Sequence, residues 1–451
     1  MRRALLDTEA VSDDDLNAAS GDGRRPRILV VGAGGREHAL VRALGRSAAK
    51  PELLCAPGNP GIAEHARLIA VAAGDIAGLA DAAQEDGCDL VVIGPEAPLV
   101  AGLADELAAR GIAAFGPSAA AARLEGSKEY AKQVMEAAGV PTARWSAVDD
   151  VAAGMAAIER YPVVLKFDGL AAGKGVVIAA DEAQARVALE EFLVARRFGT
   201  GRVVVEECLA GEELSLLALC DGERALAMAP AQDYKRIFDG DEGPNTGGMG
   251  SYSPVPDVGP ERVAEISALV HQPIVDELRE RGTPFHGVLY AGIMLTAEGP
   301  KVLEYNVRFG DPETQAVLPR MRSDAYELLA AAARPEGGGL AGVELDFGDD
   351  WAVTLVLASA GYPSAPSTGD VVSGLQDAAR DGVEITHAGT ARRREDGALV
   401  TAGGRVLNVT ALGPTPAAAR DTAYAAAHQI EFTGRQLRGD IAMRAVERTS
   451  V

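Results

Sequence analysis

Apolar runs and glycine-rich turns alternate along the first part of the chain. The run at 28–31 is followed by a tight turn and then by apolar positions at helical spacing up to residue 44. Two more buried strands, within 89–100 and 111–118, each lead into a loop with proline. This order predicts an α/β domain with a doubly wound parallel sheet, whose ligands lie at the carboxyl ends of the strands.

The pattern changes after residue 125. Hairpin-like strands with few helices between them predict an α+β region. Helices are expected at 128–138, near 181–196 and near 416–430, and strands at 162–167, 202–207, 214–220, 287–295, 301–307, 351–359 and 404–413. The glycine-rich stretch 334–342 is a predicted linker.

These patterns divide the chain into four parts. Residues 1–25 are rich in aspartate and lack apolar periodicity, so we expect a disordered tail. An α/β domain follows at 26–125, a central α+β region at 126–335 with a subdomain at about 126–200, and a β-rich α+β domain at 336–451.

Composition narrows the class of protein. The chain has 451 residues and a net charge of −22, which argues against a nucleic-acid partner. Neither a membrane-spanning run nor a secretory signal is evident. The four cysteines have no metal-like spacing, and we expect reduced thiols in a cytoplasmic protein.

Lysine is scarce, since only seven of the 43 basic residues are lysine. Two of them lie within the stretch KFDGLAAGKGV (166–176), which follows an apolar run and suggests a phosphate site. The loop fails the Walker A pattern, because Gly169 is one residue too close to Gly173-Lys174 and Gly175 replaces Ser or Thr. Metal ligands must therefore come from another part of the chain.

The segment 301–314, KVLEYNVRFGDPET, supplies candidates. Alternation along a strand places Glu304, Asn306 and Arg308 on one face, and predicts Val302 on the same face. Carboxylate and amide oxygens suit Mg²⁺, and a guanidinium suits a carboxylate or phosphate. The alternative is an exposed polar face of an edge strand. The preceding strand, 287–295, contains no acidic residue that could be a third ligand.

Three further segments have the composition of binding sites. The turn at 32–38 exposes N–H groups at a helix start, but Glu37 stands where a dinucleotide site needs a small residue, so a single phosphate ester or a purely structural turn is expected. The loop GPNTGGMGSYSP (243–254) cannot form a helix or a regular strand by composition, and is either functional or a flexible linker. Glu206 and Glu213 could accept hydrogen bonds from an adenine amine and ribose hydroxyls.

Taken in order, these motifs resemble the phosphoribosylamine–glycine ligase family, which consists of ATP-grasp enzymes of purine synthesis. The resemblance rests on GAGGREHAL, APGNPG, GPEAPLV, LEGSKEYAK, KFDGLAAGKGV, GPNTGGMGSYSP, LEYNVRFGDPET, HAGT and GGRVLNVTALG, and covers residues 27 to about 448. It implies that 126–335 is an ATP-grasp domain and that the loop at 166–176 is its lid.

The resemblance also implies a role for each matching residue. ATP contacts would come from Lys128, Lys166, Gly173, Lys174, Glu206, Leu209 and Glu213. Phosphoribosylamine would be held by Gly34, Gly35, Arg36, Glu37, Asn59 and Glu96. Glycine would be received by Asp233, Arg308 and Gly310, with Lys235 beside them. Glu304 and Asn306 would bind Mg²⁺ or Mn²⁺, and Lys174, Arg308 and Asp233 would serve catalysis.

The implied reaction joins glycine to 5-phosphoribosylamine through glycyl phosphate, in a monomer or weak dimer that binds neither nucleic acid nor membrane. Three rival interpretations remain: an ATP-grasp ligase for other substrates, a nicotinamide-dependent oxidoreductase built on the first glycine turn, and a nucleotide sensor without turnover. Activity with glycine against other amino acids tests the first interpretation. Binding of a nicotinamide cofactor tests the second, and ATP binding without turnover would indicate the third.

Overall fold

Five parallel strands form the N-terminal sheet, in the order β3-β2-β1-β4-β5. The structure is a computed structural model and describes residues 24–171 and 175–449. The strands are β1 (Arg27–Gly32), β2 (Glu52–Pro57), β3 (Arg67–Leu68), β4 (Leu90–Ile93) and β5 (Ala113–Phe115). Successive residues of β1 face opposite layers: Val30 packs with Leu40 and Leu44 of α1 (Gly35–Gly45), and Leu29 belongs to the cluster that includes α2 and α4. The predicted doubly wound sheet is confirmed.

The remaining helices of this part are α2 (Ile76–Glu85), α3 (Glu96–Val100), α4 (Leu103–Ala109) and α5 (Ala119–Gly126). The predicted disordered tail falls on residues outside the described part, apart from Arg24 and Arg25. Arg24 forms an ion pair with Asp89 at 2.6 Å. The first strand, β1, begins at Arg27, one residue after the predicted start of the α/β domain.

A separate four-stranded antiparallel sheet, in the order β6-β9-β7-β8, lies within residues 145–207, which overlap the subdomain predicted at about 126–200. Its elements are β6 (Trp145–Val148), α7 (Val151–Ala156), β7 (Val163–Phe167), β8 (Val176–Ala179), α8 (Glu182–Leu189), a π-helix (Glu190–Val194) and β9 (Val203–Glu207). One face, with Leu165 and Phe167, packs on α8 and the π-helix. The other face carries Lys166 and Glu206, because side chains alternate along a strand.

The central sheet is antiparallel, in the order β11-β10-β16-β17. It consists of β10 (Glu212–Asp221), β11 (Ala225–Ala227), β16 (His286–Thr296) and β17 (Gly299–Asn306), and α6 (Lys128–Ala137), α9 (Pro260–Val270) and α10 (Gln272–Glu280) belong to the same region. The register shifts between Gly292 and Ile293, which pair with Glu304 and Val302 and leave Leu303 as an extra residue. This bulge turns Val302 into the core, where its exposed fraction is 0%. The prediction that Val302 shares a face with Glu304 is therefore wrong.

The third large sheet combines two parts of the chain, in the order β12-β15-β18-β22-β19. Its strands are β12 (Gln232–Asp233), β15 (Gly250–Ser253), β18 (Trp351–Ala358), β19 (Val383–His387) and β22 (Arg405–Gly413). The prediction that 243–254 contains no regular strand is wrong, because β15 lies in it and β14 (Glu242–Asn245) pairs with β13 (Arg236–Phe238). Gly250 allows β15 to approach β18 closely, since a Cβ there would lie 2.7 Å from the Thr354 carbonyl oxygen.

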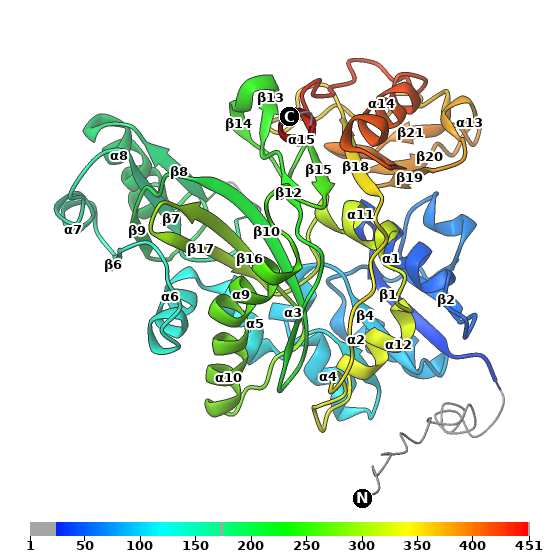
Figure 1. The fold of residues 1–451 in the computed structure, drawn as a ribbon, viewed down its shortest axis with the longest axis horizontal. Coiled ribbons are helices and arrows are strands. Elements are labelled where there is room, and N and C mark those ends of the chain that lie inside the picture. The colour runs from blue at the N-terminus through cyan, green and yellow to red at the C-terminus, as the bar shows by residue number, and fades with distance from the viewer. Residues whose placement is uncertain (1–23, 172–174, 450–451) are drawn as a thin grey trace, which may run out of the picture.

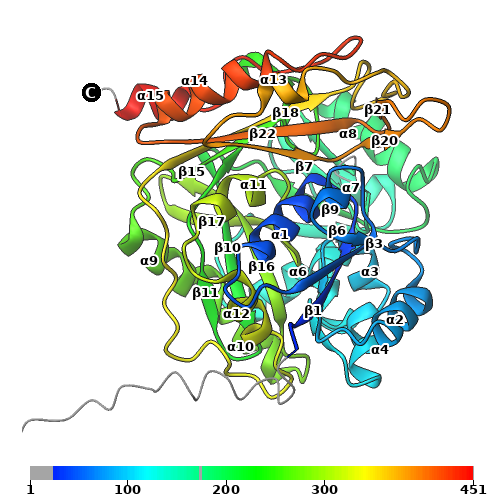
Figure 2. The same cartoon turned by 90° about the vertical axis from the view of Figure 1, so that its right-hand side faces the viewer.

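The C-terminal region is completed by a short hairpin, β20 (Thr390–Arg392) with β21 (Leu399–Thr401), and by α13 (Leu375–Ala378), α14 (Pro416–Ala427) and α15 (Met443–Thr449). Two helices, α11 (Glu313–Val317) and α12 (Ala325–Ala332), lie between β17 and β18 in the sequence. Figure 1 shows the β6–β9 subdomain at one end of the molecule and the β18–β22 region and N-terminal sheet at the other, with β10, β16 and β17 between them. Figure 2 shows α1 and α11 beneath the β18–β22 layer.

Two further expectations can be compared with the described residues. Cys55, Cys88, Cys208 and Cys220 are all free thiols, as predicted. Within 24–171 and 175–449, no helix combines the length and the apolar character needed to cross a membrane.

Candidate active site

A buried charge cluster joins the β6–β9 subdomain to the central sheet. Lys166 of β7 and Lys132 of α6 lie 3.0 Å and 3.2 Å from Glu206 Oε2 of β9, and all three side chains are at most 7% exposed. Lys166 Nζ also donates to the Leu303 carbonyl oxygen at 2.8 Å. Glu206 is thus the counter-ion of two lysines, while its Oε1 has no partner. The predicted contact of Glu206 with adenine stays a prediction.

Sequence reasoning gave no role to Lys132, although lysine is scarce and Lys132 lies one helical turn after Lys128. Its Nζ donates to Thr142 Oγ1, which donates in turn to the Val302 carbonyl oxygen, at 2.7 Å and 2.6 Å. Burial lowers the pKa of Lys132 to about 8, although Glu206 opposes the shift. Lys132 therefore fixes Glu206 and strand β17 relative to α6.

Lys128 stands at the start of α6, where it faces the beginning of the predicted lid. Its Nζ donates to the Gly169 carbonyl oxygen at 2.9 Å, and Asp168 accepts from Ser127 Oγ and from the Glu129 N–H at 3.3 Å and 3.2 Å. Burial lowers the pKa of Lys128, while Glu304 opposes the shift and Lys166 adds to it. Lys128 therefore lies close enough to interact electrostatically with both the Glu304 carboxylate and Lys166. The predicted lid residues Gly173 and Lys174 fall outside the described residues.

The predicted metal ligands lie beside these cations on β17. Burial alone would raise the pKa of Glu304, but Lys235, Lys166 and Lys128 outweigh burial, so its pKa lies below the ordinary value. An ionised carboxylate surrounded by lysines is suited to a metal ion that also carries phosphates.

The donor set around Glu304 is small. Residues Gly292 and Tyr290 of β16, which pair with Glu304 and Asn306, supply no carboxylate. In the part of the chain that the structure describes, no three His, Cys, Asp or Glu side chains gather as a metal site. One carboxylate and one amide oxygen fit Mg²⁺, which keeps several waters and takes further oxygens from nucleotide phosphates.

Arg308 lies where three parts of the chain meet. Its Nη2 donates to Glu125 Oε1 at 3.1 Å and to Asn306 Oδ1 at 3.2 Å, and its Nε lies 3.5 Å from Glu96 Oε2. Burial acts to lower the pKa of Arg308, but Glu125 and Glu96 raise it above its ordinary value. The guanidinium therefore links the candidate metal ligand Asn306 to a candidate phosphoribosylamine contact, Glu96.

Glu125 is a site residue that sequence reasoning missed, although it lies in the motif LEGSKEYAK. Its second oxygen accepts from the Val307 N–H at 2.8 Å. Glu125 thus holds both the backbone and the side chain at the end of β17. Burial raises its pKa, with Arg308 opposing the shift.

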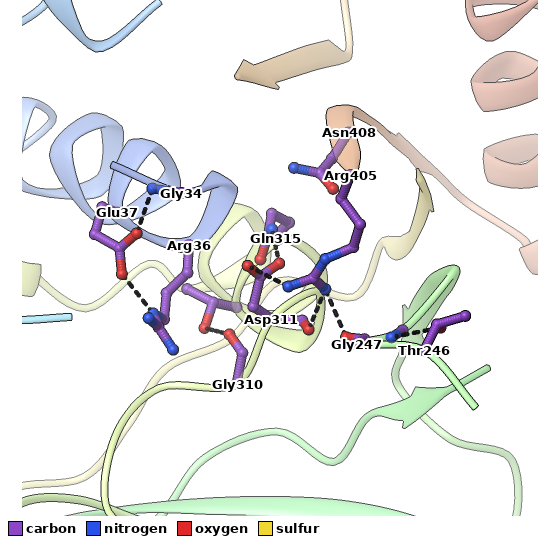
Figure 3. A network of polar contacts seen from close by, with 12 residues as sticks. Gly34, Arg36, Glu37, Thr246, Gly247, Gly310, Asp311, Gln315, Arg405 and Asn408 are labelled. Atoms are coloured by element: carbon purple, nitrogen blue, oxygen red, sulfur yellow. Dashed lines mark hydrogen bonds and ion pairs between the residues drawn. The ribbon is translucent and has the colours of Figure 1, made fainter. Parts of the chain in front are cut away.

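The first glycine turn is filled by its own glutamate (Figure 3). Glu37 accepts from the Gly34 N–H and from Arg36 Nε, both at 2.6 Å. A Cβ on Gly32 or Gly94 would lie 2.5 Å or 2.2 Å from the Glu37 side chain. Glu37 therefore occupies the space that a dinucleotide site keeps open by a small residue, and it already binds one of the N–H groups at the start of α1.

Asn59 supports the same turn. Its Nδ2 donates to the carbonyl oxygens of Ala33 and His387 at 2.9 Å and 2.8 Å, and its Oδ1 accepts from the Gly61 and Ile62 N–H groups at 3.0 Å each. The side chain is only 4% exposed. Every hydrogen-bonding position of this amide is engaged within the chain, so Asn59 orders the loop from which phosphoribosylamine contacts were predicted.

The remaining predicted residues lie where β10 meets β12. Lys235 and Glu213 form an ion pair at 2.7 Å, and both are partly exposed. Burial, together with Glu313, Glu213 and Glu304, raises the pKa of Asp233 to about 8, although Lys235 opposes the shift. Glu213, Asp233, Lys235 and Glu304 therefore form one electrostatic cluster, while Leu209 follows β9 and Gly310 lies in the loop after β17.

The C-terminal region closes this site through Arg405 of β22 (Figure 3). Its guanidinium donates to the carbonyl oxygens of Gly247 and Asp311 at 2.5 Å and 2.7 Å and to Asp311 Oδ2 at 3.0 Å. Gln315 donates to Asp311 Oδ1 at 2.8 Å. The loop 243–254 is thus held between β22 and the loop that follows β17, and is not a free linker.

A lysine-bearing sheet that faces the Glu304-bearing strand of a second sheet is the arrangement predicted above for an ATP-grasp ligase. Family models for phosphoribosylglycinamide synthetase match the N domain at residues 26–125, the ATP-grasp (A) domain at 126–314 and the C domain at 352–444. The chain belongs to the phosphoribosylglycinamide synthetase family, and it is an ADP-forming carbon–nitrogen ligase.

Individual relatives agree with this family. The chain is 52% identical to a phosphoribosylamine–glycine ligase of Streptomyces coelicolor, over 93% of this chain and 99% of the relative. It also resembles the crystal structure of a phosphoribosylamine–glycine ligase from Thermotoga maritima, with a TM-score of 0.80, 33% identity and coverage of 92% and 100%. Biotin carboxylase from Campylobacter jejuni shares the fold at 15% identity, with a TM-score of 0.67 and coverage of 93% and 94%.

Proposed function

We propose that this chain joins glycine to 5-phosphoribosylamine with ATP, giving glycinamide ribonucleotide, ADP and phosphate. The observation that carries the proposal is the buried cluster in which Lys166 pairs with Glu206 and reaches the backbone of β17 at Leu303, with Lys128, Lys166 and Lys235 lowering the pKa of Glu304 on the same strand. Three cations around one metal-ligating carboxylate suit a nucleotide polyphosphate with its divalent ion. The rival oxidoreductase interpretation is not supported, because Glu37 fills the turn that a nicotinamide cofactor would require.

The residues proposed to bind ATP and metal are divided between the β6–β9 subdomain, helix α6 and the central sheet. Lys128 and Lys166 would neutralise the ATP phosphates, and Glu206, Leu209 and Glu213 would contact adenine and ribose. Glu304 and Asn306 would hold Mg²⁺ or Mn²⁺, which supplies charge neutralisation for phosphoryl transfer. Gly173 and Lys174 would cover the phosphates as part of the lid, and would exclude water from the reacting groups.

The chemistry would proceed through glycyl phosphate. A glycine carboxylate oxygen attacks the γ-phosphorus, ADP leaves, and the mixed anhydride has phosphate as its leaving group. The amine of phosphoribosylamine then attacks the acyl carbon, releases phosphate and loses one proton. Arg308 and Asp233 would position glycine between the metal strand and the loop that holds phosphoribosylamine, near Gly34, Gly35, Arg36, Asn59 and Glu96.

Arg308 enters this scheme as a group already shared by Glu96, Glu125 and Asn306. A glycine carboxylate would therefore compete with these partners or approach the free edge of the guanidinium. In either case Arg308 keeps the two substrate regions and the metal strand in one fixed geometry. Lys235, paired with Glu213, would add positive charge on the other side of Glu304.

The test follows ADP and labelled oxygen in one experiment. ADP release should require both glycine and freshly made phosphoribosylamine, and glycine with heavy oxygen in its carboxylate should deliver label to inorganic phosphate. Labelled AMP would reject the acyl phosphate and favour adenylation. Unlabelled phosphate with ADP would indicate uncoupled hydrolysis. We also propose that the protein is cytoplasmic and that it is a monomer or a weak dimer. Light scattering on the purified protein can check the oligomeric state.

A further inference from the structure

A buried carboxylate without a cation lies at the centre of the proposed glycine site. Glu313, the first residue of α11, is 2% exposed. Its Oε1 accepts from Tyr290 OH at 2.7 Å and from Ser215 Oγ at 3.2 Å. No ion pair of the residues at 24–171 and 175–449 includes Glu313. Burying a carboxylate costs free energy unless a positive charge lies beside it, so we expect Glu313 to have a cationic partner.

The nearby cations are already engaged by other groups. Arg308 is close enough for Glu313 to raise its pKa, but its own contacts are with Glu125, Asn306 and Glu96. Lys235 forms its ion pair with Glu213. Among the described residues, Glu313 is therefore left without an ion-pair partner.

The position of Glu313 relates it to the metal strand. Tyr290 of β16 pairs in register with Asn306 of β17, so their side chains lie on the same face of the central sheet. The Tyr290 hydroxyl reaches from that face to Glu313 Oε1. The second oxygen, Oε2, lies against Gly310, where a Cβ would come within 2.5 Å of it. Glu313 is thus one side chain away from the predicted metal ligand and in contact with a predicted glycine-binding residue.

Glycine itself offers the missing cation. In the proposed reaction its carboxylate would face a γ-phosphate bound by Lys128, Lys166 and the metal ion on Glu304, so its ammonium would point away from these lysines. From the contacts and charges around the site, we propose that Glu313 binds the ammonium group of glycine, with Tyr290 and Ser215 holding the Glu313 carboxylate in place. This assignment rests on the proposed function, and makes Glu313 the residue that selects an amino acid over a simple carboxylic acid.

The test compares two ligands that differ only in the proposed contact. Glycolate has a hydroxyl in place of the glycine ammonium. Glu313→Gln keeps an acceptor for Tyr290 and Ser215 but removes the charge. We expect its KM for glycine to rise about 10- to 100-fold, while the inhibition constant of glycolate and the KM for ATP stay within about threefold of the wild-type values.

Two outcomes overturn the assignment. Equal weakening of glycine and glycolate would mean that Glu313 only shapes the pocket. A fall in kcat with an unchanged KM for glycine would instead make Glu313 an acceptor for the proton that leaves the phosphoribosylamine amine.

Asp221→Asn provides the matched control. Asp221 is also fully buried, at 0% exposure, but its carboxylate accepts from the backbone N–H groups of Glu223, Arg224 and Leu340 at 3.1, 2.8 and 2.8 Å. This variant should lose thermal stability and keep the glycine-to-glycolate ratio of the wild type. A wild-type enzyme without ADP release in the presence of both substrates would remove the proposed function and this inference with it. A wild-type enzyme that turns over, with an unchanged ratio in Glu313→Gln, would remove the inference alone.

Discussion

Lys166 Nζ and Glu206 Oε2 lie 3.0 Å apart, and both side chains are more than nine-tenths buried. Lys132 approaches the same oxygen from α6 at 3.2 Å. Two lysines therefore share one buried carboxylate, but only Lys166 stands on the strand that leads into the predicted lid. We therefore expect Lys132 to contribute to stability and Lys166 to contribute to ATP binding as well.

The first prediction uses that pair. Lys166→Met and Lys132→Met each remove one counter-ion of Glu206, so both should lower the free energy of unfolding, by about 1–3 kcal/mol while the other lysine remains. Only Lys166→Met should weaken ATP affinity at least tenfold in calorimetry, and Lys166→Arg should not restore it fully, because a planar guanidinium is not a compact charge. Unchanged ATP affinity in Lys166→Met would remove this residue from the nucleotide site.

The second prediction concerns the metal strand. Glu304→Gln and Asn306→Ala should raise the Mg²⁺ concentration for half-maximal rate, because each change removes a charge or an oxygen ligand. Val302→Ala is the control on the same strand, since its side chain faces the core. It should cost about 2 kcal/mol of stability and leave the Mg²⁺ requirement unchanged. The same Mg²⁺ curve in all three variants would make the polar face of β17 structural.

The third prediction concerns Glu125, which holds Arg308 and the Val307 N–H. Glu125→Gln keeps the shape of the side chain but removes the charge opposite Arg308. We expect the KM for glycine and the Mg²⁺ requirement to rise together, by about threefold to tenfold, because Arg308 also contacts Asn306. Glu129→Gln, four residues further along in α6 and paired with Arg202, is the control and should change neither quantity. A change in stability alone for Glu125→Gln would contradict the proposed link.

The fourth prediction concerns pH and the contact between α1 and β19. His38 Nδ1 accepts from the His387 N–H at 2.9 Å, and burial lowers the pKa of His38 to about 2 and that of His387 to about 4. Both pKa values lie below the ordinary 6.5, so between these values the unfolded chain binds protons at the two histidines and the native protein does not. The associated stability is complete above about pH 6.5 and is lost as the pH falls toward the native pKa values, by about 2 kcal/mol per histidine between pH 6.5 and 5.

Urea unfolding at several pH values checks this sign. His38→Gln keeps an acceptor for the His387 N–H but cannot take up a proton. Its stability should therefore fall less between pH 6.5 and 5 than that of the wild type, by about 2 kcal/mol. Parallel curves for the two proteins would show that His38 does not contribute to the acid sensitivity.

Local patterns predicted most of the elements, because each depends on neighbouring residues. The strands at 301–307 and 351–359 and the turn after 31 are found close to their expected positions. The predicted face of Val302 was wrong because of the bulge at Leu303. This bulge depends on the register between β17 and β16, which cannot be read from alternation along one strand. β15 was missed because the glycine that disfavours a strand by composition is the one that lets β15 approach β18.

The limits at the site have a similar cause. The strand pattern located Glu206, but its two lysines come from α6 and β7, so the sequence could not show that its charge is already balanced. Glu313 lies in a motif that was recognised, yet its partners Ser215 and Tyr290 come from two other strands. A role that arises from such distant contacts requires the folded chain.

The sheet of β12, β15, β18, β22 and β19, which joins two distant parts of the chain, has a consequence for recombination between related genes. β15 and β18 exchange backbone hydrogen bonds across about a hundred residues of sequence, and Gly250 and Leu355 are direct partners. A recombination event that joined residues 1–335 of this chain to the end of a distant relative would leave β15 next to a foreign strand. Natural chimaeras should therefore keep 230–255 and 350–415 from the same parent, and these two stretches should pass between lineages as one unit.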